Sequence, residues 1–97
     1  MKFELPVRSL NIANVARELG YRPLGYTPDG EMNCVRPLGA DYPRFHLYLK
    51  ETGDMFLFSL HLDQKRPSYG RETAHSGDYD GEVIEDEARR IKEKLQS

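Results

Sequence analysis

The chain has 97 residues, of which 38% are hydrophobic, and a mean hydropathy of −0.71, which indicates one small domain with a large polar surface. Its formal net charge of −2 argues against a general nucleic-acid-binding protein, because such proteins carry a basic excess. A single cysteine excludes an intramolecular disulfide bond, and no stretch approaches the about 20 apolar residues that span a bilayer. The N-terminus also lacks the long apolar segment of a signal peptide. We therefore expect a single domain over residues 1–97, located in the cytoplasm and without a membrane partner.

The N-terminal third predicts an extended segment, a helix and a series of turns. Residues 1–8 alternate apolar and polar side chains, and Pro6 limits them to an edge strand or an extended arm. Apolar residues recur with helical spacing from Leu10 to Leu19, so a helix is predicted there. Residues 21–30 contain two prolines and a strong turn signal, and we expect them to form turns rather than a strand. A strand is predicted over Glu31–Leu38.

The clearest structural feature is a β-hairpin over Pro43–Lys65, with its turn at Gly53-Asp54. This register places His46 opposite His61 and Arg44 opposite Asp63. Alternate positions on the two strands are apolar and are predicted to face the core: Phe45, Leu47, Leu49, Phe58, Leu60 and Leu62. The opposite, polar face is the candidate site. A shift of one residue in the register would separate the two histidines.

The C-terminal part predicts a long loop and a helix. Residues 64–81 contain almost no aliphatic side chains, and a helix with one apolar stripe is predicted from Glu82 to Gln96. The predicted fold class is α+β in the order α-β-β-β-α. It has a three-stranded antiparallel sheet, to which residues 1–8 can add an edge strand. Both helices are expected on the apolar face of the sheet, which leaves the histidine face open to water or to the loop.

Three histidines and one carboxylate form the first candidate for chemistry. His46, His61 and Asp63 share the polar hairpin face, and His75 lies in the long loop. Imidazole and carboxylate ligands suit Zn²⁺, so these four residues form a candidate metal site. Without a metal, His46 and His61 beside Asp63 suit acid/base catalysis, because imidazole titrates near neutral pH, and Arg44 would stabilise developing negative charge. The alternative is that these are ordinary surface histidines beside an Arg44–Asp63 ion pair.

A second candidate is a calcium site at the start of the last helix. The segment from Ser76 to Glu87 follows the calcium-loop pattern of EF-hands, with Asp78 and Asp80 at ligand positions and Glu87 at the bidentate end position. Ser76 replaces the usual aspartate, however, and no entering helix precedes it. Capping of the last helix by Asp78 or Asp80 is the simpler explanation.

A third candidate is a basic and aromatic segment that follows the hairpin. Lys65, Arg66, Tyr69 and Arg71 lie in it, and Tyr48 lies on the neighbouring polar face. Tyrosine stacks on bases and arginine binds phosphates, so these residues, together with Arg44, are candidates for an RNA contact. The alternative is an ordinary polar loop, because the acidic stretch that follows would repel phosphates.

The element order, with a histidine in the middle-strand run Arg44–Leu49, resembles the small HicA-type toxins, which share the double-stranded-RNA-binding-domain-like fold. The resemblance implies an RNA-cleaving domain in which His46 is catalytic and a partner antitoxin holds it inactive. It covers the element order over most of the chain but only His46 of the family's motif, since the glycine-serine-histidine-histidine run is absent.

Two functional classes therefore stay open, and with them the question of whether the chain is an enzyme. In the first, a histidine-lined face binds a metal or acts on RNA or a phosphorylated ligand. In the second, the same face and the long loop form a non-enzymatic module that binds another protein, and the histidines are incidental.

Overall fold

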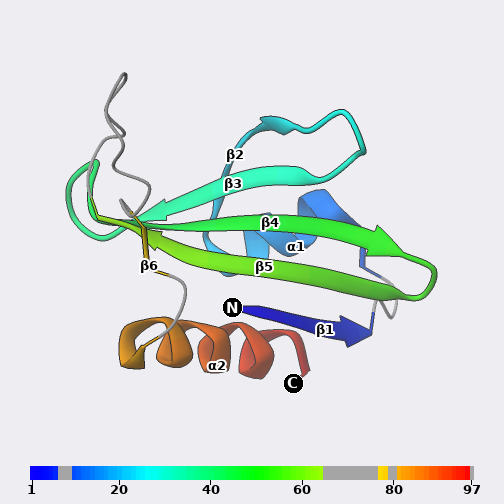
Figure 1. The fold of residues 1–97 in the computed structure, drawn as a ribbon. Coiled ribbons are helices and arrows are strands. Elements are labelled where there is room, and N and C mark those ends of the chain that lie inside the picture. Colours follow the sequence, from blue (N-terminus) through cyan, green and yellow to red (C-terminus); the bar gives the residue numbers. More distant parts are fainter. Residues whose placement is uncertain (7–9, 65–76, 79–80, 97) are drawn as a thin grey trace.

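The fold is an antiparallel sheet with two helices, seen in a computed structural model that describes residues 1–6, 10–64, 77–78 and 81–96 (Figure 1). The strands are β1 (Lys2–Pro6), β2 (Arg22–Tyr26), β3 (Met32–Pro37), β4 (Arg44–Thr52), β5 (Met55–Asp63) and β6 (Gly77–Asp78). The helices are α1 (Ile12–Leu19) and α2 (Glu82–Gln96). The strand order is β1-β5-β4-β3-β2, and β6 also pairs with β5. The α+β class is therefore as predicted.

The prediction of a three-stranded sheet was wrong, because the sheet gains strands on both sides of the hairpin. The edge strand expected near the N-terminus is β1, which pairs with β5. On the other side, β2 occupies the segment that was predicted to form turns. All five residues of β2 are exposed, and the register shifts between Pro23 and Gly25, so the segment has no alternating pattern to reveal it. The turn signal itself is real, since the Gly30 N–H donates to the Thr27 carbonyl at 2.9 Å, between β2 and β3.

The register predicted for the central hairpin is confirmed. β4 and β5 pair over their full lengths, with His46 opposite His61 and Arg44 opposite Asp63. Gly53 at the turn has a φ of 63°, a left-handed backbone conformation that glycine adopts without steric cost. The two strands therefore present the same alternation, and one face is apolar while the other carries the histidines.

The hydrophobic core lies between the apolar face of the sheet and the two helices. In Figure 1, α1 lies behind the sheet and α2 runs beside β1. From the helices, the core takes these residues: Val15, Ala16, Leu19, Ile84, Ala88 and Ile91. From the hairpin, it takes Phe45, Leu47, Leu49, Phe56, Phe58, Leu60 and Leu62. Cys34 lies opposite Leu47 and is fully buried, so it belongs to this core and not to the histidine face.

Candidate functional site

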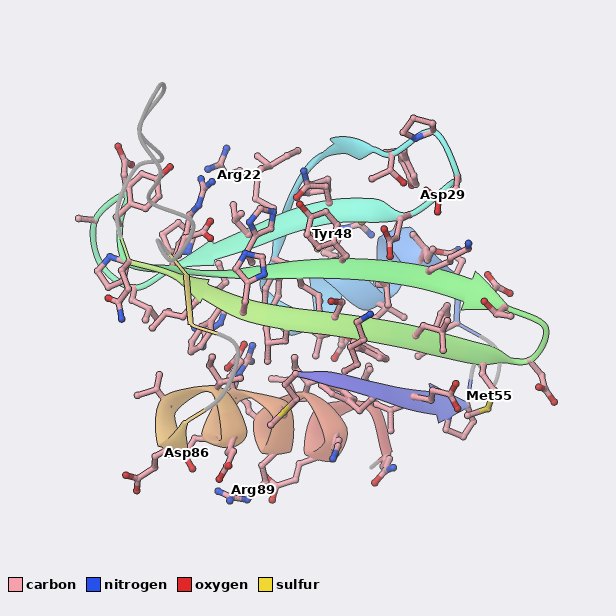
Figure 2. All side chains as sticks on the ribbon, viewed as in Figure 1. Arg22, Asp29, Tyr48, Met55, Asp86 and Arg89 are labelled. Atoms are coloured by element: carbon pink, nitrogen blue, oxygen red, sulfur yellow. The ribbon has the colours of Figure 1, made fainter. Side chains whose placement is uncertain are left out.

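The face of the sheet opposite the core carries a cluster of His46, His61 and Asp63, which we call the triad. His61 and Asp63 are two residues apart on β5 and therefore point to the same face, and His46 lies directly across on β4. Tyr48, labelled in Figure 2, continues this face along β4. The pairing of β4 with β5 is thus what brings the three side chains together.

The Asp63 carboxylate is the centre of the triad. His46 Nδ1 lies 3.0 Å from Asp63 Oδ2, and His61 Nε2 lies 3.0 Å from Asp63 Oδ1. Arg44 Nε donates to Asp63 Oδ2 at 3.1 Å. One ligand atom from each member of the triad can be chosen such that all three lie within 4.8 Å of one another, which is close enough for one metal ion to bind all three.

The second ring nitrogen of His46 is also engaged, because Nε2 contacts Oδ1 of Asn33 on β3. Both nitrogens of His46 thus face oxygen atoms, whereas a neutral imidazole carries only one N–H. Burial lowers the pKa of His46 and outweighs the opposing influence of Asp63, so the neutral ring is favoured. A neutral ring satisfies both contacts if a cation takes the place of the proton between Nδ1 and Asp63, or if the Asn33 amide turns to present its nitrogen.

The triad is more enclosed than the sequence suggests. Only 12% of the His46 side chain and 14% of each of the His61 and Asp63 side chains are exposed. The His46 ring stacks against Tyr48 with 4.9 Å between centroids, and its centroid lies 4.7 Å from that of His61. Val35, opposite His46 on the same face, is fully buried. Of the two alternatives expected for this face, open to water or to the loop, the first is therefore wrong, and the second involves residues 65–76, which lie outside the described part of the chain.

Of the other predicted binding residues, Arg44 and Tyr48 lie at the triad. The Arg44 guanidinium lies over the Tyr42 ring, 4.7 Å from its centroid. Several predicted site residues lie outside the described part of the chain, namely His75, Lys65, Arg66, Tyr69, Arg71 and Asp80. Asp78 lies in β6, where it pairs with Leu62.

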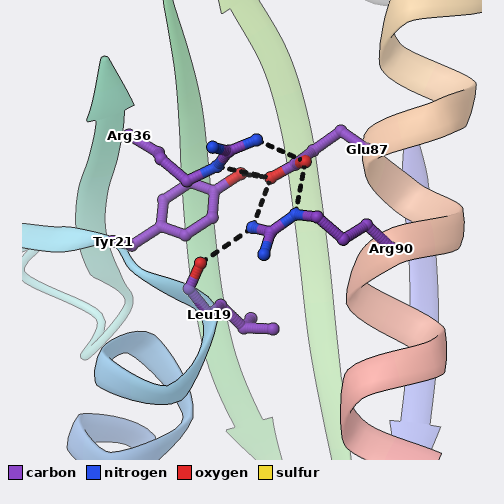
Figure 3. A network of polar contacts seen from close by, with 5 residues as sticks. All are labelled: Leu19, Tyr21, Arg36, Glu87 and Arg90. Carbon is purple, nitrogen blue, oxygen red and sulfur yellow. Dashed lines mark hydrogen bonds and ion pairs between the residues drawn. The ribbon is translucent and has the colours of Figure 1, made fainter. Parts of the chain in front are cut away.

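Glu87, predicted as a calcium ligand, instead forms the centre of a polar network (Figure 3). Its two carboxylate oxygens accept hydrogen bonds from both Arg36 and Arg90, at 2.8 to 3.1 Å, and from the Tyr21 hydroxyl at 2.6 Å. Arg90 also donates to the Leu19 carbonyl at 2.8 Å. These bonds occupy the oxygens that bidentate calcium binding would need, so the calcium prediction has no support at this position.

The sequence analysis missed this network, although a signal for it exists. Glu87 lies three residues after Ile84 and four before Ile91, which is the spacing of the buried stripe of α2. An acid in such a stripe indicates a buried partner. Asn33 was missed for another reason, since its place beside His46 depends on how β3 pairs with β4.

Two further findings bear on function. Among the helices in the described ranges, none combines the length and the apolar character that crossing a membrane requires. Comparison of the chain with family models, with curated proteins and with solved structures finds no significant match. The resemblance to HicA-type toxins and the cytoplasmic location both stay predictions.

Proposed function

We propose that the protein binds a divalent metal ion, of which Zn²⁺ is the best fit, through His46, His61 and Asp63. The observation that carries the proposal is the convergence of His46 Nδ1 and His61 Nε2 on the two oxygens of one carboxylate, each at 3.0 Å. Ligand atoms about 2.0 to 2.2 Å from a tetrahedral zinc ion stand roughly 3.3 Å apart. The two histidine–carboxylate distances are already close to this value, and ligand atoms that lie within 4.8 Å of one another would have to approach by up to about 1.5 Å for one ion to bind all three residues.

Asn33 supports a metal at this position in particular. A metal-bound histidine usually donates its other ring N–H to an oxygen, which fixes the orientation of the ring. With a metal at His46 Nδ1, the proton moves to Nε2 and is donated to Asn33 Oδ1, and both contacts of the ring are satisfied.

The composition of the triad favours a reactive site over a structural one. Structural zinc sites have four protein ligands and are rich in cysteine, whereas the ligands within the described ranges are two histidines and one carboxylate, which leave a position for water or a ligand. Zinc at such a position lowers the pKa of bound water and polarises oxygen atoms. The two histidines and the carboxylate also suit other first-row metals that accept imidazole.

Acid/base catalysis is the second candidate, because Asp63 contacts both imidazoles and would orient them. A general base, however, needs a free nitrogen within reach of the substrate. Both nitrogens of His46 have partners in Asp63 and Asn33, so His46 takes a substrate proton only after one contact breaks. We therefore favour the metal.

Calorimetric titration of the untagged, chelator-treated protein with Zn²⁺ tests the proposal. We expect one ion per chain, and we expect Asp63→Asn to weaken binding by roughly a hundredfold or more, because it removes a charged ligand. Asp29→Asn is the matched control, since Asp29 is exposed and pairs with Lys50 at 3.6 Å, away from the triad. Absence of zinc binding to the unmodified chain, or equal binding by the Asp63→Asn variant, would contradict the proposal.

A further inference from the structure

A row of residues across the sheet places an arginine beside the triad. Arg22 on β2 lies opposite Val35, Val35 opposite His46, and His46 opposite His61. Residues directly opposite in an antiparallel sheet point to the same face, so Arg22 shares the face of the triad. Figure 2 labels Arg22 and Tyr48, both on this face.

Arg22 is close enough to contact a ligand bound at the triad. Adjacent strands are 4.7 to 4.9 Å apart, so the backbone of Arg22 lies about 10 Å from that of His46. An extended arginine side chain covers most of that span. Val35, which lies between them, is apolar and offers no competing charge.

The cations on this face differ in what they already bind. Lys50 pairs with Asp29. Arg44 contacts Asp63 through Nε alone, and its terminal nitrogens make no hydrogen bond within the described ranges. Arg22 is exposed and has no ion-pair partner in the part of the chain that the structure describes. Arg22 and the terminal nitrogens of Arg44, whose guanidinium group also contacts Asp63 and Tyr42, thus offer donors beside the triad.

We propose that the metal-loaded triad binds the phosphoryl group of a phosphate monoester, with one terminal oxygen on the metal and the others on Arg22 and Arg44. The inference rests on the proposed metal function and names its ligand class. A phosphate monoester has three terminal oxygens, so each of the three cationic groups can contact a separate oxygen. A phosphate diester or a carboxylate has two. Guanidinium groups are well suited to these oxygens because their N–H donors are planar and permanently charged.

The charges favour an anion far more strongly when the metal is present. A divalent ion together with Arg22 and Arg44 far exceeds the single negative charge of Asp63. Without the ion, the excess is one positive charge, shared between exposed Arg22 and partly buried Arg44 and weakened by solvent screening at Arg22. Binding of the phosphate monoester is therefore expected to depend on the metal.

Titration of the zinc-loaded protein with methyl phosphate, dimethyl phosphate and acetate tests the inference. We expect methyl phosphate to bind at least about tenfold more tightly than the other two ligands, and to bind the metal-free protein at least about tenfold more weakly. We expect Arg22→Gln to weaken methyl phosphate binding roughly tenfold and to leave zinc affinity unchanged. Arg89→Gln is the control, because Arg89 is an exposed arginine on α2 that pairs with Asp86 at 2.8 Å.

The outcomes separate the two proposals. If zinc binds as expected but the Arg22→Gln variant binds methyl phosphate as tightly as the unmodified protein, the ligand inference is overturned and the metal site stands. Equal binding of methyl phosphate and dimethyl phosphate would likewise overturn the ligand inference and leave the metal site standing. If zinc itself does not bind, both proposals fail.

Discussion

In each of two polar clusters of this protein, the triad and the network around Glu87, a single carboxylate contacts most of the other polar side chains. Asp63 contacts two histidines and an arginine, and Glu87 accepts bonds from two arginines and a tyrosine. The sequence revealed Asp63, because it shares an alternating face with His46 and His61. It did not reveal Asn33 as the second partner of His46, since no local pattern states which residue of β3 lies beside that ring.

Replacement of Asn33 tests its role beside His46. We expect Asn33→Leu to weaken zinc binding about 10- to 100-fold, because leucine cannot accept the proton that a metal-bound His46 donates from Nε2. Asn33→Asp keeps an acceptor oxygen and should retain most of the affinity. Competition titration against a zinc-binding dye measures all three proteins. If the leucine variant binds zinc as tightly as the unmodified chain, Asn33 does not orient His46.

At the scale of elements, the hairpin of β4 and β5 was predictable, and β2 was not. The hairpin has strict alternation and a glycine turn, so both its register and its apolar face followed from the residues alone. β2 is fully exposed and contains Pro23 and Gly25, so only pairing with β3 makes it a strand. Edge strands of this kind carry no pattern of their own, which is why the sheet was predicted with too few strands.

Substitution of Gly53 tests how much the left-handed conformation at the turn contributes to the stability of the hairpin. Its φ of 63° is costly for a residue with a Cβ, although no other group would contact that atom. We expect Gly53→Ala to lower the free energy of unfolding by about 1 kcal/mol, and Gly53→Asn to lower it less, because asparagine tolerates this conformation. Urea unfolding measures both changes, provided that the slope of the unfolding free energy against urea concentration is the same in the variants and the unmodified chain. An alanine variant as stable as the unmodified chain would indicate that the turn can relax to another conformation.

At the scale of the whole molecule, the core that stabilises the fold and the candidate site lie on opposite faces of the sheet. One face packs against α1 and α2, and the network around Glu87 ties α2 to Arg36 on β3 and to the Leu19 carbonyl at the end of α1 (Figure 3). The other face holds the triad. The division into an apolar face and a polar face was predictable from alternation, whereas the Glu87 network requires the relative placement of three elements that are far apart in the sequence.

The Glu87 network gives stability a specific dependence on pH. Burial alone would raise the pKa of Glu87, but hydrogen bonds from Arg90, Arg36 and Tyr21 outweigh it and lower the pKa below its ordinary value. Because the folded-state pKa is lower, the stabilisation is present above the unfolded-state pKa of about 4.3 and is lost as the pH falls through the folded-state value.

We therefore expect Glu87→Gln to destabilise the protein by about 3 kcal/mol at pH 7, since it leaves two arginines without their shared partner, and by progressively less as the pH falls below about 4.3. Unfolding in urea across this pH range measures the difference. Glu93→Gln, on the exposed side of α2, is the control. A difference between the Glu87→Gln variant and the unmodified chain that stays constant with pH would show that the charge of Glu87 does not contribute to stability.

The central claim is that His46, His61 and Asp63 together bind one metal ion. The most direct measurement is an anomalous difference map, recorded at the zinc absorption edge, from crystals of the untagged protein grown with stoichiometric Zn²⁺. We predict one strong peak between His46 Nδ1, His61 Nε2 and the Asp63 carboxylate, about 2.0 to 2.2 Å from each ligand atom. A map without a peak at the triad, or with its only strong peak elsewhere on the chain, would contradict the claim.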